Sequence, residues 1–239
     1  MRTPARGIPL ARIPEPGAQA VAELAFALML ALARGVRVAD AHLRQGHWAK
    51  YEIEGRLING KTLGVIGAGN IGRRVGQIGA ALGMQPLGCV AHPSRAVAEV
   101  LSRLGVQLAP FDRVVAEADF LSVHVPLLPS TRHLVDAAVL ARVKPGAFLV
   151  NLARGGVVDE AALHTALIRG DRLRGAALDV HAAEGEGKVS PLASLPNVIL
   201  TPHIGASTVD TQREIGRRVI DLVDAFAAER DAAMELVSA

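Results

Sequence analysis

The hydrophobic pattern of the chain changes at about residue 61. From there on, short apolar runs alternate with amphipathic stretches of helical length, which is typical of repeated strand–helix–strand units. Right-handed crossovers between such units predict an α/β fold: a doubly wound parallel sheet with helices on both faces and with ligands beyond the carboxyl ends of the strands. We expect strands at residues 63–66, 87–90, 106–108, 120–125, 147–152, 175–180 and 198–201. Helices are expected at residues 73–82, 95–104, 111–116, 136–142, 160–168 and 209–229.

The first sixty residues follow another pattern. Residues 18–34 are apolar on nearly every face, and a helix without a polar face must be covered by a partner. Their most apolar part, residues 21–33, is too short to span a bilayer, so we expect a buried or interface helix. A further helix is expected up to Arg44, and a strand-like segment at residues 7–10. His42 and His47 are five positions apart, a poor spacing for metal ligands, so we expect solvated or loop histidines and no metal site.

A glycine-rich motif lies in the first regular strand–helix unit. The sequence KTLGVIGAGNIG at residues 61–72 places the spacing GxGxxG between an apolar strand and a helix. Gly67 permits a tight turn, Gly69 lets the backbone approach a pyrophosphate, and Gly72 lets the helix pack on its strand. The helix start at Asn70 and Ile71 offers N–H groups and a positive dipole end to phosphates. Such a motif alone is more often just a turn, but this context favours a dinucleotide site.

Composition narrows the class of protein. Half of the 239 residues are apolar but only 3% are aromatic, so Ala, Val, Leu and Ile must build the core, as in buried parallel sheets. The 26 basic and 23 acidic residues are spread along the chain, which leaves no footprint for nucleic acid. Cys89 is the single cysteine, which excludes an intrachain disulfide and fits a reducing cytoplasm. We therefore expect a cytoplasmic protein without a nucleic-acid or membrane partner.

Polar residues stand at the ends of several predicted strands, where a ligand of such a sheet would bind. They are His124 and Pro126, Arg154, Asp179 and Glu184, and His203. Each also has a plain structural explanation, since an arginine can cap a turn, a loop glutamate can face solvent, and a lone histidine is more often part of the core. The functional interpretation is favoured because an arginine, a carboxylate and a histidine all occur at strand ends of one dinucleotide-binding sheet.

These three side chains have complementary chemistry. A hydride that leaves a secondary alcohol requires a base for the hydroxyl proton, and histidine titrates nearest to neutral pH. A carboxylate beside a histidine favours its protonated form and orients the ring. An arginine fork can bind a substrate carboxylate with two hydrogen bonds. The trio therefore predicts an oxidoreductase of 2-hydroxy acids.

The sequence from about residue 6 to residue 226 resembles the C-terminal, nucleotide-binding part of the D-isomer-specific 2-hydroxyacid dehydrogenases. This family includes D-3-phosphoglycerate and D-lactate dehydrogenases and glyoxylate and hydroxypyruvate reductases. The stretches that carry the resemblance are AQAVAELAFALMLALAR, GKTLGVIGAGNIGR, KPGAFLVNLARGGVVDEAAL, GAALDV and LTPHIGAST. The resemblance implies a Rossmann-like sheet, NAD or NADP as cofactor, a small D-2-hydroxy or 2-keto acid as substrate, and a homodimer formed through residues 18–34.

The resemblance also implies roles for individual residues. Arg154 matches the arginine that binds the substrate carboxylate, Glu184 matches the glutamate paired with the catalytic histidine, and that histidine falls on His203. Asp179 matches the aspartate that contacts the nicotinamide carboxamide. Further residues expected to line the cofactor are Pro126, Arg154, the backbone of Leu152 and Ala153, and the backbone from His203 through Gly205 to Ala206.

Three departures from the family pattern qualify these expectations. The acidic residue that usually holds the adenosine ribose is replaced by His92, with Ser94 and Arg95 nearby, which suits the 2′-phosphate of NADP unless these are merely surface residues. The Phe and Pro that commonly flank the glutamate are His181 and Gly185, so the loop of the glutamate is less constrained. The N-terminal substrate domain of the family is also largely missing, so we expect nucleotide binding with poor turnover.

We expect three segments: residues 1–17 as a linker or remnant of the substrate domain, residues 18–208 as the dinucleotide-binding domain, and residues 209–239 as a helix that would pack on the substrate domain. The main hypothesis is an NAD(P)-dependent oxidoreductase with His203 as acid/base, Glu184 as its partner and Arg154 as the carboxylate anchor. The alternative is a nucleotide-binding or dimerisation module without turnover, and a nucleic-acid-binding corepressor is a distant third. The identity of the 2-hydroxy acid and the choice between NAD and NADP stay open.

Overall fold

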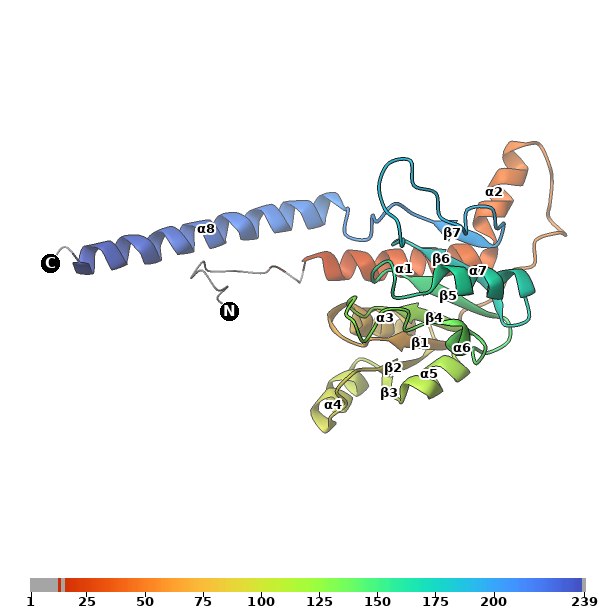
Figure 1. Cartoon of the computed structure of the whole chain (residues 1–239), viewed down its shortest axis with the longest axis horizontal. Coiled ribbons are helices and arrows are strands. Elements are labelled where there is room, and N and C mark those ends of the chain that lie inside the picture. The colour runs from red at the N-terminus through yellow and green to blue at the C-terminus, as the bar shows by residue number, and fades with distance from the viewer. Residues whose placement is uncertain (1–12, 14–15, 238–239) are drawn as a thin grey trace. The chain divides into compact units, whose positions relative to one another are not determined.

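Seven parallel strands form one sheet in the order β3-β2-β1-β4-β5-β6-β7 in the computed structural model of the chain (Figure 1). The strands are β1 (Thr62–Ile66), β2 (Gln85–Cys89), β3 (Gln107–Leu108), β4 (Phe120–Val123), β5 (Ala147–Asn151), β6 (Leu173–Leu178) and β7 (Val198–Leu200). The structure describes residue 13 and residues 16–237, so the strand-like segment predicted at residues 7–10 lies outside the described residues. The predicted doubly wound parallel sheet is confirmed.

Eight helices accompany the sheet in the described part of the chain. They are α1 (Pro16–Arg34), α2 (Val36–Arg44), α3 (Asn70–Ala81), α4 (Arg95–Arg103), α5 (Phe111–Glu117), α6 (Ala137–Leu140), α7 (Glu160–Arg169) and α8 (Val209–Val237). The chain divides into two compact units: residues 21–205, which contain the sheet, and the two ends up to residue 20 and from residue 206. This division into units does not test the segment boundaries predicted at residues 17 and 208, which stay predictions.

The strands are apolar on both sides because helices cover both faces of the sheet. A Cβ added to Gly79 of α3 would meet Leu63 of β1 at 2.5 Å and Phe26 of α1 at 3.5 Å, so α1 and α3 share one face. A Cβ added to the neighbouring Gly64 would meet the carbonyl oxygen of Val114 in α5 at 3.0 Å. Since successive residues of a strand point to opposite faces, α5 covers the other face.

Most observed strand and helix ends lie within three residues of the predicted ones, but α8 extends to Val237, eight residues beyond the predicted end at residue 229. The strand β2 begins before the predicted residue 87 and includes Pro86, although proline cannot donate a hydrogen bond within a sheet. The neighbour β3 pairs with β2 only from Leu87 onward, so the missing N–H group of Pro86 faces no partner strand. The helix α3 begins at Asn70, three residues earlier than predicted, because its first turn already starts inside the glycine motif.

The helix α1 is long and apolar enough, by length and composition, to cross a membrane, but half of that stretch is buried inside the protein. Ala22, Ala25 and Met29 are buried within the chain itself, whereas Leu30 is 40% exposed. The helix therefore contributes to the core, which is one of the two predicted roles, buried or interface helix, and Leu30 is an apolar residue that it presents to solvent. The helix α8 of the other unit exposes Val219, Ile220 and Val223.

Candidate active site

The glycine motif connects β1 to α3 in a geometry that only glycine allows. Gly67 has a φ of 92°, and a Cβ at this position would lie 2.7 Å from the carbonyl oxygen of His124. A Cβ on Gly72 would lie 2.2 Å from the carbonyl oxygen of Gly67, so the helix packs directly on the turn. A Cβ on Gly69 would meet nothing within 4 Å, and no side chain caps the start of α3 at this residue. The cradle therefore fits a pyrophosphate at the N-terminus of α3.

The residues predicted for the adenosine end follow β2. The Ser94 hydroxyl accepts a hydrogen bond from the Val97 N–H at 3.2 Å and caps α4. The Arg95 side chain is 93% exposed and forms an ion pair with Glu99 at 3.0 Å, and His92 is also exposed. The basic groups of His92 and Arg95 are thus accessible to the 2′-phosphate of NADP, but the same exposure is ordinary for surface residues at a strand end. These contacts therefore do not distinguish NAD from NADP.

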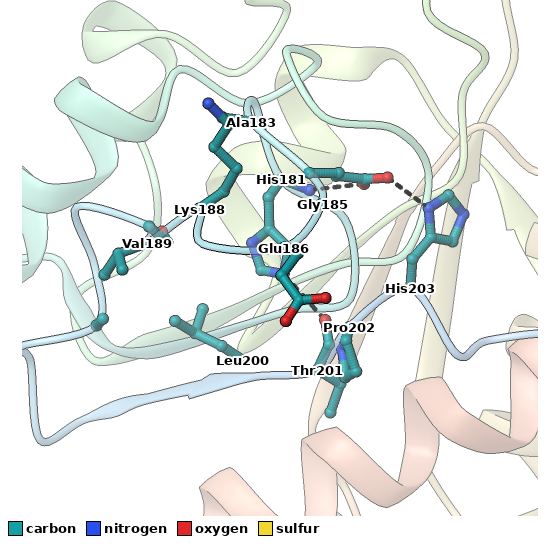
Figure 2. A pocket seen from close by; sticks show the side chains of 13 residues that line it. His181, Ala183, Gly185, Glu186, Lys188, Val189, Leu200, Thr201, Pro202 and His203 are labelled. Atoms are coloured by element: carbon teal, nitrogen blue, oxygen red, sulfur yellow. Dashed lines mark hydrogen bonds and ion pairs between the residues drawn. The ribbon is translucent and has the colours of Figure 1, made fainter.

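Glu184 and His203 form a pair at the carboxyl ends of β6 and β7 (Figure 2). The Nδ1 of His203 lies 2.9 Å from Oε2 of Glu184, whose other oxygen accepts a hydrogen bond from the His181 N–H at 3.0 Å. Burial opposes ionisation of Glu184, but these hydrogen bonds and the charges of the two histidines outweigh it, so the pKa of the carboxyl lies below its ordinary value. His203 has a φ of 55°, a left-handed conformation uncommon for a residue with a side chain and frequent at functional sites.

Asp179 holds the backbone that presents His203. This aspartate is 1% exposed, and its Oδ1 accepts hydrogen bonds from the Thr201 hydroxyl at 2.6 Å and the Ile204 N–H at 2.9 Å. Its Oδ2 accepts from the Gly205 N–H at 2.8 Å. The sequence predicted a contact with the nicotinamide carboxamide for Asp179, and that role stays a prediction. The structure adds a second role, because the carboxylate fixes the residues on both sides of His203.

Glu160 is a positioning residue that the sequence interpretation missed. It is the first residue of the helix predicted at residues 160–168, where an acidic side chain ordinarily faces solvent, yet it is 8% exposed. Its carboxylate accepts hydrogen bonds from the Ala182 N–H at 2.6 Å and from the Ser190 hydroxyl at 3.3 Å. It thereby holds the loop of Glu184 from both sides. The signal in the sequence was the position of Glu160 directly after Asp159. Because Asp159 already caps α7, the carboxylate of Glu160 is not needed as a cap.

Arg154 lies in the loop after β5, next to the loop of Glu184. The Asn151 side chain is buried and shapes this loop, since its oxygen accepts a hydrogen bond from the Ala153 N–H at 3.1 Å. A Cβ on Gly155 would lie 1.8 Å from the carbonyl oxygen of His181, so the two loops touch through their backbones. Arg154 is exposed, and one N–H of its guanidinium donates a hydrogen bond to the Ala153 carbonyl oxygen at 2.6 Å. No other hydrogen bond of this guanidinium is formed within the described part of the chain, so its other N–H groups can bind a carboxylate.

A cavity of about 610 Å³ opens beside the Glu184–His203 pair (Figure 2). Its lining includes His181, Glu184, Lys188, Thr201 and His203. His181 stands where the family usually has a phenylalanine, and its Nε2 lies 2.9 Å from the Thr201 carbonyl oxygen. Gly185 replaces the family proline and has a φ of 116°, a value that a proline ring excludes. The loop therefore follows a backbone path that the usual sequence could not adopt.

The remaining predicted cofactor residues lie at the same edge of the sheet, with one exception. Pro126 follows β4, and its carbonyl oxygen accepts a hydrogen bond from the Thr131 hydroxyl at 2.6 Å. Leu152 and Ala153 follow β5 and are buried, and Gly205 follows β7. Ala206 belongs to the unit formed by the chain ends, so its predicted contact with the cofactor is not placed by the structure.

The sequence also matches curated and structurally known proteins. The chain is 44% identical over 219 residues to D-3-phosphoglycerate dehydrogenase of Mycobacterium tuberculosis (strain ATCC 25618 / H37Rv), an alignment that covers 92% of this chain and 40% of that protein. The chain thus spans less than half the length of this curated relative. The D-lactate dehydrogenase from Aquifex aeolicus, solved in complex with NAD and lactic acid, is similar with 33% identity and a TM-score of 0.83, covering 94% of this chain and 71% of that chain.

A third similar structure was solved with NADPH in place of NAD. The acyclic imino acid reductase Bsp5, solved in complex with NADPH and D-Arg, is similar with 30% identity and a TM-score of 0.79, covering 90% of this chain and 67% of that chain. Residues 26–205 match the model of the D-isomer specific 2-hydroxyacid dehydrogenase, NAD binding domain. The chain therefore belongs to the D-isomer specific 2-hydroxyacid dehydrogenase family, as its motifs predicted.

Proposed function

We propose that the protein transfers a hydride between NAD or NADP and a small D-2-hydroxy or 2-keto acid. The observation that carries this proposal is the Glu184–His203 pair, with 2.9 Å between Oε2 and Nδ1, at the carboxyl edge of a sheet whose glycine motif fits a dinucleotide. When bound, the nicotinamide supplies or accepts the hydride at the carbon that carries the hydroxyl group.

The side chains of this chain then handle the proton and the substrate. With Nδ1 of His203 hydrogen-bonded to Glu184, the proton is exchanged through Nε2, which gives it to the carbonyl oxygen during reduction and removes it from the hydroxyl group during oxidation. The Glu184 carboxylate orients the ring and stabilises its charged form. Arg154 binds the carboxylate of the substrate and fixes the carbon that reacts.

A second candidate function is a nucleotide-binding module without turnover. The side chains of His203 and Glu184 are 46% and 40% exposed, so within this chain the catalytic pair is open to water. Hydride transfer proceeds best in a site from which water is excluded. This exposure favours the module over the enzyme for this chain, although the chemistry of the residues favours the enzyme.

Steady-state assays distinguish the two functions. The chain is incubated with glyoxylate, hydroxypyruvate or phosphohydroxypyruvate and with NADH or NADPH, and nucleotide binding is measured in parallel by fluorescence titration. The oxidoreductase predicts turnover that falls about 100-fold or more in His203→Gln and in Arg154→Lys, while nucleotide affinity is kept. Nucleotide binding without turnover of any of the three acids supports the module instead.

We also propose a homodimer, with the exposed Leu30 of α1 in its interface. Light scattering at micromolar concentration tests this assembly, because a dimer has twice the mass of the 25.0 kDa chain. A monomer in that experiment, or a dimer that persists unchanged in Leu30→Glu, contradicts the proposed interface.

A further inference from the structure

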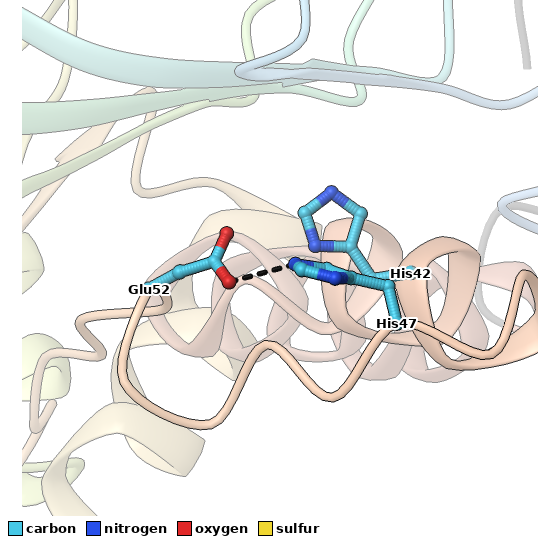
Figure 3. Close-up of side chains that lie close together, drawn as sticks. All are labelled: His42, His47 and Glu52. Carbon is cyan, nitrogen blue, oxygen red and sulfur yellow. Dashed lines mark hydrogen bonds and ion pairs between the residues drawn. The ribbon is translucent and has the colours of Figure 1, made fainter.

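Three side chains with metal-binding chemistry meet at the end of α2, outside the candidate active site (Figure 3). His42, His47 and Glu52 each offer one ligand atom, and these atoms all lie within 4.8 Å of one another. The Nε2 of His47 lies 2.7 Å from Oε1 of Glu52, and the two imidazole rings meet edge to face with their centroids 5.0 Å apart. We propose that these residues bind a divalent transition-metal ion, with Zn²⁺ as the best match.

The backbone at the end of α2 brings the two histidines together. The His47 N–H donates to the carbonyl oxygen of His42 at 2.9 Å, and the Gly46 N–H donates to that of Leu43 at 3.0 Å. These bonds form a Schellman motif, for which Gly46 takes the left-handed conformation, with a φ of 79°. A spacing of five residues places two histidines on different sides of a continuous helix. Across the Schellman motif the same spacing brings His42 and His47 together, as a metal site requires.

Local turns also return Glu52 to the histidines. The Ala49 N–H donates to the carbonyl oxygen of His47 at 3.1 Å, and the Glu52 N–H donates to that of Ala49 at 3.1 Å. All three ligands thus come from one short segment whose backbone is already folded without an ion. Such pre-organisation lowers the conformational cost of binding.

The ligand set and its distances suit a tetrahedral ion. Two imidazoles and one carboxylate are ligands that Zn²⁺ accepts, with the fourth position open to water. Around a tetrahedral Zn²⁺ with bonds of about 2.1 Å, ligand atoms lie about 3.4 Å apart. The 2.7 Å contact of His47 and Glu52 is a hydrogen bond that the ion would replace by moving the two atoms apart by about 0.7 Å. Both side chains are more than half exposed and have room to rotate.

His42 provides an independent reason for a ligand at this place. Its Nδ1 is shielded from solvent and has no hydrogen-bond partner among the described residues. Figure 3 shows the His42 ring turned toward His47 and Glu52. A buried ring nitrogen without a partner is costly, and a bound ion would satisfy it.

Trp48 makes the test specific, because it is the single tryptophan of the chain and directly follows the ligand His47. Untagged protein is titrated with Zn²⁺ by calorimetry and with Ni²⁺ while Trp48 fluorescence is recorded. We expect one Zn²⁺ per chain and a change in Trp48 fluorescence that saturates at one equivalent of Ni²⁺. In His42→Ala and in His47→Ala, affinity for either ion falls by roughly 100-fold or more.

Two matched variants locate the ion. His164→Ala removes a partly exposed histidine of α7 and is expected to bind Zn²⁺ like the unchanged protein. His203→Ala removes the histidine of the catalytic pair and is also expected to keep binding. The proposal is overturned if the protein binds no Zn²⁺, if binding survives in His42→Ala and His47→Ala, or if it is lost in His203→Ala alone, which places the ion at the active site.

Discussion

The partly buried imidazole of His124 links the stability of the sheet domain to pH. This residue follows β4, its Nε2 lies 2.7 Å from the hydroxyl oxygen of the buried Ser122, and its Nδ1 is shielded and has no hydrogen-bond partner among the described residues. Burial lowers the pKa of His124 from 6.5 to about 4. A charge on the ring would be costly in this place, so the folded protein keeps His124 neutral at pH values at which an unfolded histidine is protonated.

The direction and size of the effect follow from these two pKa values. Between pH 6.5 and about pH 4, the unfolded chain binds a proton at His124 that the folded chain does not, so the free energy of unfolding falls as the pH falls. Each pKa unit corresponds to about 1.4 kcal/mol, so the loss over this window is at most about 3 kcal/mol. Well above pH 6.5 the residue is neutral in both states and the contribution is constant.

The substitution His124→Gln isolates this contribution. Glutamine can keep a hydrogen bond to the Ser122 hydroxyl but does not titrate. Between pH 6.5 and pH 4 the free energy of unfolding of the variant should therefore fall by up to about 3 kcal/mol less than that of the unchanged protein. Urea unfolding followed by circular dichroism at several pH values measures the difference, and His164→Gln on α7 serves as the control with the wild-type slope. Parallel curves for the protein and His124→Gln would refute the reasoning.

Three further predictions concern the active-site loops and the nucleotide. Glu184→Gln keeps an oxygen for the histidine but loses the charge, so kcat should fall about 10- to 100-fold with little change in KM, which steady-state kinetics will show. His92→Asp should shift the ratio of NADH to NADPH affinity roughly tenfold toward NADH in fluorescence titrations, and an unchanged ratio would remove this position from cofactor choice. Gly155→Ala should lower both Tm and activity, because its Cβ would lie 1.8 Å from the His181 carbonyl oxygen, whereas Gly216→Ala, with open space around its Cβ, should lower neither.

The sheet was predictable from sequence because most of its strands are short apolar runs followed by a helix, although β6 leads to β7 without one. Right-handed crossovers predicted a doubly wound parallel sheet and the glycine motif identified its first regular strand, but the order of the strands comes from the structure. The ends of the elements were less predictable, as Pro86 illustrates. A proline argues against a strand interior, and only the short pairing of β3, which starts at Leu87, explains why β2 includes it.

The His42–His47–Glu52 cluster shows what sequence spacing leaves out. Counting positions along a helix separates His42 from His47, but Gly46 ends the helix and its left-handed conformation reverses the chain. A glycine four residues after a histidine near a helix end was the available signal. It predicts that the residues at both ends of the Schellman motif meet, whatever their chemistry.

Burial separates three carboxylates at the active site that the sequence makes look alike. Asp179 is 1% exposed, Glu160 is 8% exposed, and the Glu184 side chain is 40% exposed. The two buried groups accept hydrogen bonds from backbone N–H groups and hold the loops of His203 and Glu184, respectively. Only the exposed one reaches the histidine side chain. Because a buried carboxylate must keep its partners, substituting Asp179 should misplace the loop of His203 and substituting Glu160 should misplace the loop of Glu184, whereas substituting Glu184 removes one partner of the His203 ring and leaves its backbone in place.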